Sequence, residues 1–326
     1  MKSRVRLFLR GIYRVLTGLN GFLYDFRRFF LYGGWRENLK DTITRNYNVM
    51  MAYHGLEKSL SFKNRNPNSG WGNAERVFTR LKIAASEKEI GYHDHGAKEV
   101  LLKFLQLQAN KERPRAKQML QELKTMNFKS DDAHGSIELE RDFFRKGVLK
   151  KPEDFFFSRY SLREYAPQKV EDELIERGIK LAMKTPSVCN RHAWHIYHSS
   201  ERDIIDTTLK YQNGNRPFGK KVPNLLVITV DLKGFFAGAE HYQHWIDGGL
   251  VSMSLMYAFH SLGVASCPLN WCQNPKTDLA LRKKIKVKKS HTVIMMMALG
   301  YADETNKVCA SGRRHVNEIY SKIEVR

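Results

Sequence analysis

The sequence predicts an α+β domain that is preceded by a mainly helical N-terminal region. Apolar residues at helical spacing over residues 170–184 indicate a helix, and acidic residues occupy its first turn, where the helix dipole favours negative charge. Residues 195–198 and 291–298 are strand-like. Upstream, residues 97–126 indicate two helices that are broken near Pro114, because proline cannot continue a helix. Helices and strands that follow a purely helical stretch favour this fold class.

The first expected element is a basic amphipathic helix within residues 1–36. Its apolar residues recur at spacings of three and four. Its longest uncharged stretch, residues 15–24, is far shorter than the roughly 20 residues that span a bilayer. Two interpretations stay open: the helix binds an anionic membrane surface, or it packs on the protein or a dimer partner. The apolar residues are Leu9, Ile12, Leu16, Leu19, Leu23, Phe26 and Phe30, and the cations are Arg4, Arg6, Arg10, Arg14, Arg27 and Arg28.

A helical extension is expected over residues 37–130, and residues 131–136 form the predicted linker to a domain over residues 137–326. The first helix of that domain is expected over residues 137–146. Within the extension, residues 54–72 have the pattern of a helix that leads into a glycine-containing loop.

Charge and cysteine content restrict the classes of function. The net charge is +21, and residues 1–50 carry ten Lys and Arg against three Asp and Glu. The basic run at residues 282–289 is interpreted as a solvated helix end and loop. No recognised nucleic-acid-binding module surrounds it, so no specific nucleic acid is expected as a partner. The four cysteines match no zinc pattern and indicate free thiols in a reducing compartment.

Two polar segments carry the functional prediction. Arg159 and Arg163 are four residues apart with Ser161 between them, so two guanidinium groups and a hydroxyl can meet one anion. A phosphate monoester, with nearly two charges and three acceptor oxygens, suits such a cluster. The second segment, residues 185–194, follows the predicted helix and contains a Pro-Ser-x-x-Asn turn with polar side chains on a non-helical backbone.

From about Phe155 to the C-terminus, the chain resembles the nitroreductase family of FMN-dependent oxidoreductases. The family has an Arg-x-Ser-x-Arg type of segment, a Pro-Ser-x-x-Asn segment, a long central helix ending in Leu-Gly, and a late strand ending in Gly-Tyr. Here the last two lie at residues 247–263 and 299–301, in the family's order. The resemblance implies a nitroreductase-like three-layer fold, in which helices flank a central mixed or antiparallel sheet.

The resemblance also implies an FMN site that is built across a homodimer interface. It assigns residues 159–163 to the FMN phosphate and the pyrimidine side of the ring, residues 187–190 to the flavin of the partner subunit, and residues 269–270 to the neighbourhood of flavin N5. One of two arginines, Arg313 or Arg314, is implied to return to the phosphate. The implied cofactor-binding residues are Arg159, Tyr160, Ser161, Arg163, Pro186, Ser187, Val188, Asn190, Asn215, Pro268, Leu269, Asn270, Arg313 and Arg314.

The sequence departs from the family pattern at two places. Tyr160 stands where a second cation is usual, and His192-Ala193 stands where Gln-Pro is usual. His192 is interpreted either as a residue over the substrate face or as a structural histidine. No catalytic side chain and no metal ligand are assigned, because the flavin itself carries the hydride chemistry. The implied cycle is ping-pong: NADH or NADPH reduces FMN and leaves, and a small-molecule acceptor is then reduced.

A weaker resemblance, carried by residues 54–72, is to extensions on nitroreductase-like proteins of bacterial surface polysaccharide synthesis. It implies a link to polysaccharide biosynthesis. Alternatives stay open: another use of reduced flavin, such as flavin fragmentation or dehalogenation, a membrane-associated scaffold or assembly protein that retains a flavin fold, or a nucleic-acid binder. The expected location is cytoplasmic, with peripheral attachment to the inner face of the membrane through residues 1–36.

Overall fold

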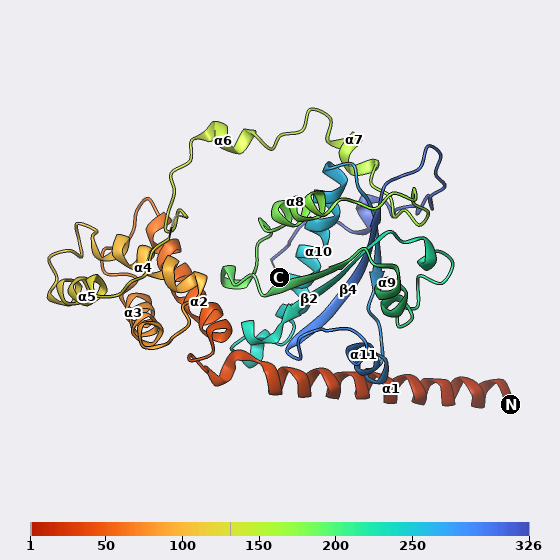
Figure 1. Ribbon diagram of the computed structural model, residues 1–326, viewed down its shortest axis with the longest axis horizontal. Helices are drawn as coiled ribbons and strands as arrows, with labels where there is room; N and C mark the ends of the chain where they lie inside the picture. The colour runs from red at the N-terminus through yellow and green to blue at the C-terminus, as the bar shows by residue number, and fades with distance from the viewer. Residues whose placement is uncertain (1, 131, 326) are drawn as a thin grey trace.

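The computed structural model describes residues 2–130 and 132–325, so Met1, Arg326 and Asp131, the first residue of the predicted linker, lie outside the described residues. Figure 1 shows a long N-terminal helix that runs beneath a domain with a central sheet, and a helical group to one side of that domain. The predicted fold class, an α+β domain preceded by a mainly helical region, is confirmed.

The middle layer is a four-stranded sheet with the strand order β1-β2-β4-β3. All three strand pairs are antiparallel, and Val227 of β2 lies opposite Tyr197 of β1 and Met296 of β4. Two of these strands were expected near their observed bounds, at residues 195–198 and 291–298. The strands are β1 (Trp194–Ser199), β2 (Asn224–Asp231), β3 (Ala265–Asn270) and β4 (His291–Gly300).

Helices cover both faces of the sheet. Side chains alternate along β2, so Leu226 and Ile228 pack with α8 (Asp172–Ala182) and α10 (Gln243–Ser261), whereas Leu225 and Val227 pack toward α9 (Arg202–Leu209) and α11 (Pro275–Arg282). The outer layer of α8 and α10 is tight. A Cβ atom at Gly178 would lie 2.4 Å from the ring of Phe259, so only glycine permits this helix spacing.

The helical extension has a hydrophobic core of its own. It is built from α2 (Thr42–Ser61), α3 (Trp71–Ser86), α4 (Tyr92–Leu105) and α5 (Pro114–Lys124). The expected helix break is confirmed, because Pro114 stands in the first turn of α5, where a missing N–H costs nothing. A fully buried ion pair joins Arg45 to Asp94 at 3.1 Å and ties α2 to α4.

The segment between the two cores corrects one expectation. Residues 137–146 were expected to form the first helix of the sheet domain, but α6 spans only Arg141–Arg145. Its side chains are exposed, so no buried apolar face stabilises further turns. A second short helix, α7 (Pro152–Phe157), follows and leads to the arginine segment. The domain boundaries at residues 36, 130 and 137 stay predictions.

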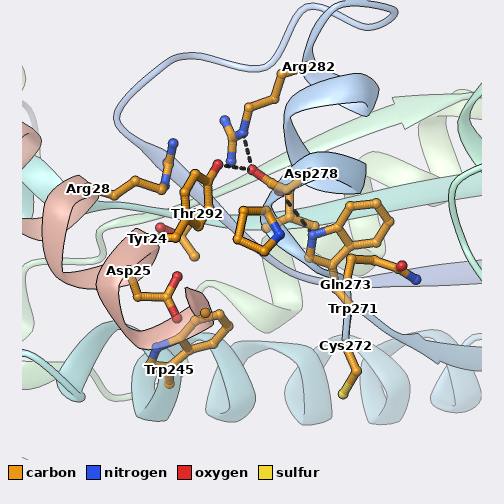
Figure 2. A pocket seen from close by; sticks show the side chains of 13 residues that line it. Tyr24, Asp25, Arg28, Trp245, Trp271, Cys272, Gln273, Asp278, Arg282 and Thr292 are labelled. Atoms are coloured by element: carbon orange, nitrogen blue, oxygen red, sulfur yellow. Dashed lines mark hydrogen bonds and ion pairs between the residues drawn. The ribbon is translucent and has the colours of Figure 1, made fainter. Parts of the chain in front are cut away.

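The N-terminal helix α1 (Lys2–Tyr32) packs on the sheet domain through its C-terminal half. Tyr24 donates a hydrogen bond of 2.5 Å to Asp278, and Arg28 donates to the backbone oxygens of Lys289 and His291 at 3.0 and 2.8 Å. Figure 2 shows Tyr24 and Arg28 beside a cavity of about 120 Å³ that Trp245 and Trp271 also line. Within residues 2–130 and 132–325, no helix combines the length and apolar character needed to cross a membrane.

Two buried histidines predict that acid destabilises the fold. Burial lowers the pKa of His93 in α4 and of His244 in α10 from near 6.5 to about 4. Above pH 6.5 both residues are neutral whether the chain is folded or unfolded. As pH falls from 6.5 toward 4, only the unfolded chain takes up these protons, so each histidine removes up to about 3 kcal/mol of stability.

The measurement is urea unfolding at a series of pH values between 7 and 4. We expect the midpoint to fall with pH in the wild type and to fall less steeply in a His93→Gln/His244→Gln variant. Parallel profiles for the two proteins would contradict the assignment.

Candidate functional site

A cavity of about 440 Å³ gathers most of the residues that the first polar segment predicted. It lies between that segment, the C-terminal half of α10 and the C-terminal tail. The predicted residues that line it are Arg159, Tyr160, Ser161, Arg163 and Arg313, and the other lining residues are Phe156, Phe157, Met253, Tyr257, Cys309, Ala310 and Ser311.

The edge strand β3 positions the arginine segment. Ser161 forms an isolated parallel bridge with Ser266 of β3, and the Leu162 N–H donates to the Ser266 oxygen at 3.2 Å. Leu162 is buried in the core beneath, so its neighbours in the sequence turn toward the cavity. Burial raises the pKa of the Cys267 thiol, while Arg163 and Arg159 oppose that shift. The two cations therefore lie close to β3.

The electrostatics of this cavity suit an anion. The Nη1 atom of Arg159 is buried and has no hydrogen-bond partner within the part of the chain that the structure describes. Arg163 makes only long contacts, at 3.4 Å to the Ser161 oxygen and 3.6 Å to the Cys309 sulfur. Buried cationic donors without partners are costly, and a phosphate that accepts charge-assisted hydrogen bonds removes that cost. The donor set therefore fits a phosphate.

The structure distinguishes between Arg313 and Arg314, which the sequence left as equal candidates for the phosphate. Arg313 lines the cavity, where its side chain donates to the Ser311 oxygen, whereas Arg314 is not among the lining residues. Asn215 lies elsewhere and is buried, and its amide nitrogen donates to the backbone oxygens of Leu209 and Gln212. That amide group holds its own loop together, so its predicted role at a cofactor stays a prediction.

Residues 268–270 lie close along the chain to the bridge that fixes the arginine segment. Pro268 is tolerated in β3 because this is an edge strand. Leu269 is buried in the core, and Asn270 ends the strand, where its backbone oxygen accepts a 3.1 Å hydrogen bond from Gln212. The structure thus brings the first polar segment and β3 together on one edge of the sheet.

The second polar segment forms a loop with an unusual backbone. Cys189, Asn190 and His192 have φ angles of 47°, 56° and 50°, in the left-handed region that residues with a side chain rarely adopt. Such conformations cost roughly 1 kcal/mol or more each and concentrate at functional sites. The loop is fixed at both ends. The Ser187 hydroxyl accepts from the His192 N–H at 3.0 Å, and the Val188 N–H donates to the Asp247 carboxylate at 3.3 Å.

Arg191 anchors this loop from inside the protein. Its side chain is fully buried, and it donates to the Gly234 oxygen at 2.5 Å and to Glu240 at 3.1 Å. Burial tends to raise the pKa of Glu240, but hydrogen bonds from Arg191 and from the Phe236 N–H outweigh it and leave that pKa lowered. The pair is therefore charged at neutral pH and holds the loop in its left-handed form.

The helical extension also contacts this loop. Tyr47 of α2 and Val188 pack against the same buried cluster, and Tyr47 lies close to Gly234. His54 stands two turns further along α2, on the same face as Tyr47. Burial lowers the pKa of His192, and His54 of the extension adds a smaller contribution in the same direction. The role of His192 was left open from the sequence, and the structure adds a neighbour from the extension.

The two predicted halves of the site do not meet in one subunit. Residues 187–190 contact α10 near Asp247, whereas Met253 and Tyr257 of α10 line the cationic cavity. Asp247 and Tyr257 are separated along the helix axis by about 15 Å. The cavity and the loop therefore lie toward opposite ends of α10.

Several lining residues were missed from the sequence. Phe156, Phe157 and Cys309 lie just outside the motifs, and Met253 and Tyr257 look like ordinary core residues of a helix. The aromatic pair Phe156-Phe157, separated from Arg159 by Ser158, was the one local signal, since aromatic rings commonly line cofactor sites. Among residues 2–130 and 132–325, no group of three or more metal-ligating side chains is positioned to hold an ion.

Part of the chain is similar to known proteins. Residues 157–301 match the model of the Nitroreductase family. A protein of Archaeoglobus fulgidus named "Putative NADH dehydrogenase/NAD(P)H nitroreductase" is 27% identical over 169 residues, which cover 50% of this chain and 93% of that protein.

Two solved structures are also similar to part of the chain. An FMN-dependent nitroreductase of Clostridium difficile R20291 aligns with a TM-score of 0.45 and 20% identity, covering 52% of this chain and 98% of its own. A nitroreductase with bound FMN from Desulfitobacterium hafniense DCB-2 aligns with a TM-score of 0.41 and 19% identity, covering 54% of this chain and 100% of its own.

Proposed function

We propose, because residues 157–301 match the model of the Nitroreductase family, that the protein is an NAD(P)H-dependent flavin oxidoreductase that uses FMN. The observation that carries the proposal is the buried, unpartnered Nη1 atom of Arg159 in a cavity that Ser161, Arg163 and Arg313 share. These residues would hold the FMN phosphate. Tyr257 and Phe157, which line the same cavity, would exclude water from its apolar side.

The chemistry needs few protein groups. When bound, FMN supplies the redox step by accepting a hydride from NADH or NADPH and passing it to a small-molecule acceptor in a ping-pong cycle. The residues of the chain would bind the FMN and orient its ring. Arg163 would stabilise negative charge near the pyrimidine side of the ring, and residues 268–270 would place a backbone N–H near flavin N5. No side chain is required to break a covalent bond.

The active unit is proposed to be a homodimer. The separation of the cationic cavity and the 187–190 loop along α10 supports this, because a loop that is distant from the flavin of its own subunit is available to the flavin of a partner. The strained backbone of Asn190 further supports a binding role for the loop.

Asn190→Ala is expected to lower flavin retention although it removes no side-chain hydrogen bond within the subunit, because Asn190 makes none among the described residues. Flavin content after gel filtration measures retention, and light scattering measures the mass of the loaded species. A flavin-loaded monomer at micromolar concentration, or full retention in the variant, would count against a shared site. Asn127→Ala, on the exposed surface of the extension, serves as the control.

The location is proposed to be cytoplasmic, with peripheral attachment to the inner face of the membrane. All four cysteines are free thiols in the structure, which fits a reducing compartment. The identity of the acceptor and the link to surface polysaccharide stay predictions that depend on the resemblance of residues 54–72. The extension is supported as a contributor to acceptor choice, because α2 packs beside the 187–190 loop.

A visible spectrum of the purified full-length protein tests the proposal. We expect yellow protein that releases FMN on denaturation, and anaerobic addition of NADH or NADPH should bleach the flavin absorbance. Colourless protein that stays colourless after incubation with FMN would refute the enzyme and favour the alternative, a scaffold that retains the flavin fold.

A further inference from the structure

The contacts of α1 with the protein use Tyr24 and Arg28 together with Phe29, which packs near His244. Gly21, Tyr24 and Arg28 lie on one side of a helix with 3.6 residues per turn, and they are the positions that meet α11 and the start of β4. Figure 2 shows this junction, with Tyr24 and Arg28 directed toward the sheet domain. Tyr24, Arg28 and Phe29 therefore pack α1 on the protein, and the apolar residues on its other side make no such contact among the described residues.

The apolar stripe of α1, Leu9 to Phe30 at spacings of three and four, faces away from these contacts. Leu16, Leu19 and Leu23 project on the side roughly opposite Tyr24 and Arg28. The seven stripe residues are between 41% and 68% exposed. Every described side chain from Val5 to Asn20 is exposed as well. An amphipathic helix thus rests on the protein with its apolar face outward, a continuous apolar surface that in water requires a partner.

A second basic segment lies beside α1. The backbone of Lys289 accepts the hydrogen bond from Arg28, and Asp278, which accepts from Tyr24, also binds Arg282 at 2.6 Å. These contacts hold the loop after α11 against the helix, although more than 250 residues separate the two in sequence. The exposed lysines of this loop, here called the lysine run, are Lys283, Lys284, Lys286, Lys288 and Lys289.

The positive charge around the apolar stripe indicates which partner binds to it. The described side chains of α1 include five arginines and a single acid, Asp25, and the lysine run adds charge of the same sign. A second copy of α1 laid on the stripe would bring arginines toward arginines with no row of acids to pair them, which coiled coils require at their flanking positions. An anionic lipid surface instead accepts both the apolar stripe and the cations, each worth about 1 kcal/mol near the lipids.

We propose that α1 and the lysine run form one binding surface for anionic membranes. The stripe from Leu9 to Phe30 lies in the headgroup region with the helix axis parallel to the bilayer, and the exposed arginines of α1 and the lysine run supply the positive charge that attracts the lipid phosphates. The sheet domain then sits on the side of α1 that faces the cytoplasm. The proposal does not depend on the flavin chemistry, because none of these residues lines the cationic cavity.

Sedimentation with phosphatidylcholine vesicles, with and without phosphatidylglycerol, tests the surface on the full-length protein. We expect wild-type protein to bind only the anionic vesicles and to be released as salt rises. Leu16→Glu/Leu23→Glu should abolish binding, since both side chains are already exposed and the change leaves the fold intact. Lys286→Ala/Lys288→Ala/Lys289→Ala should weaken binding by roughly 100-fold.

A matched triple, Lys111→Ala/Lys124→Ala/Lys129→Ala, removes the same charge from the distant extension and should bind almost as the wild type does. Circular-dichroism melting checks that every variant is folded. Equal binding by wild-type and Leu16→Glu/Leu23→Glu protein, or equal binding to neutral vesicles, overturns the proposal. So does a wild-type oligomer that the leucine variant dissociates in the absence of lipid, because a second copy would then be the occupant.

Discussion

Replacing Arg159 and Arg163 together by alanine will weaken FMN binding by about two to four orders of magnitude. Each charge-assisted hydrogen bond to the phosphate contributes about 1.5–3 kcal/mol, so two such contacts amount to about 3–6 kcal/mol. The loss should exceed any change in folding stability. Arg163 is exposed, and the buried nitrogen of Arg159 has no partner within the described residues whose loss would destabilise the apoprotein.

Fluorescence titration of apoprotein with FMN measures the affinity, and urea unfolding of the apoproteins measures stability. Arg141→Ala/Arg145→Ala is the control, because these arginines of α6 are exposed and do not line the cavity. The same FMN affinity in the Arg159/Arg163 variant and the wild type would place the phosphate elsewhere. A single Arg313→Ala change should have a smaller effect in the same direction, and Arg314→Ala should have less.

Replacing Arg191 by methionine is expected to destabilise the sheet domain by about 3 kcal/mol and to release bound flavin. The buried guanidinium is the inner anchor of the 187–192 loop, and removing it leaves the partly buried carboxylate of Glu240 without its cation. Glu240 retains the hydrogen bond from the Phe236 N–H, so the cost lies at the lower end for a broken buried pair. The loop is then free to leave its left-handed conformation.

Urea unfolding and flavin content after gel filtration give the two readouts. Arg191→Met/Glu240→Gln should recover part of the stability, because the remaining side chain is neutral. It should not recover flavin retention, since the contact with the Gly234 oxygen is still missing. A single variant with wild-type stability and full flavin content would show that the loop does not depend on this anchor.

Local patterns predicted the parts of the fold that local chemistry controls. The helix at residues 170–184 and the strands at residues 195–198 and 291–298 follow from side-chain periodicity, and they appear as α8, β1 and β4. The arginines of residues 159–163 were close in sequence, so their shared cavity required only a turn. The expected helix at residues 137–146 was wrong in extent, because α6 spans only Arg141–Arg145. The apolar residues of this segment are exposed in the described structure, so no buried contact stabilises further helical turns.

Features that depend on long-range contacts could not be predicted from the sequence. Arg313 and Arg314 are adjacent and identical, and only the path of the C-terminal tail brings Arg313 to the cavity. The lysine run and α1 are basic segments at opposite ends of the chain, and nothing in either segment indicates that they are neighbours. The outward direction of the apolar stripe was likewise hidden, since helical spacing defines a face but not what that face meets.

The Asp278 carboxylate joins α1 to the sheet domain, and its contact with Trp271 allows tryptophan fluorescence to report on this junction. Trp271 donates its indole N–H to Asp278 at 3.1 Å, and Tyr24 donates to the same carboxylate. If α1 moves away, water reaches that indole, and its emission should shift to longer wavelength. Because Trp271 directly follows Asn270, quenching of the same emission would report a nearby flavin. Among the five tryptophans, Trp271 is therefore the one whose emission should respond both to the N-terminal helix and to cofactor occupancy.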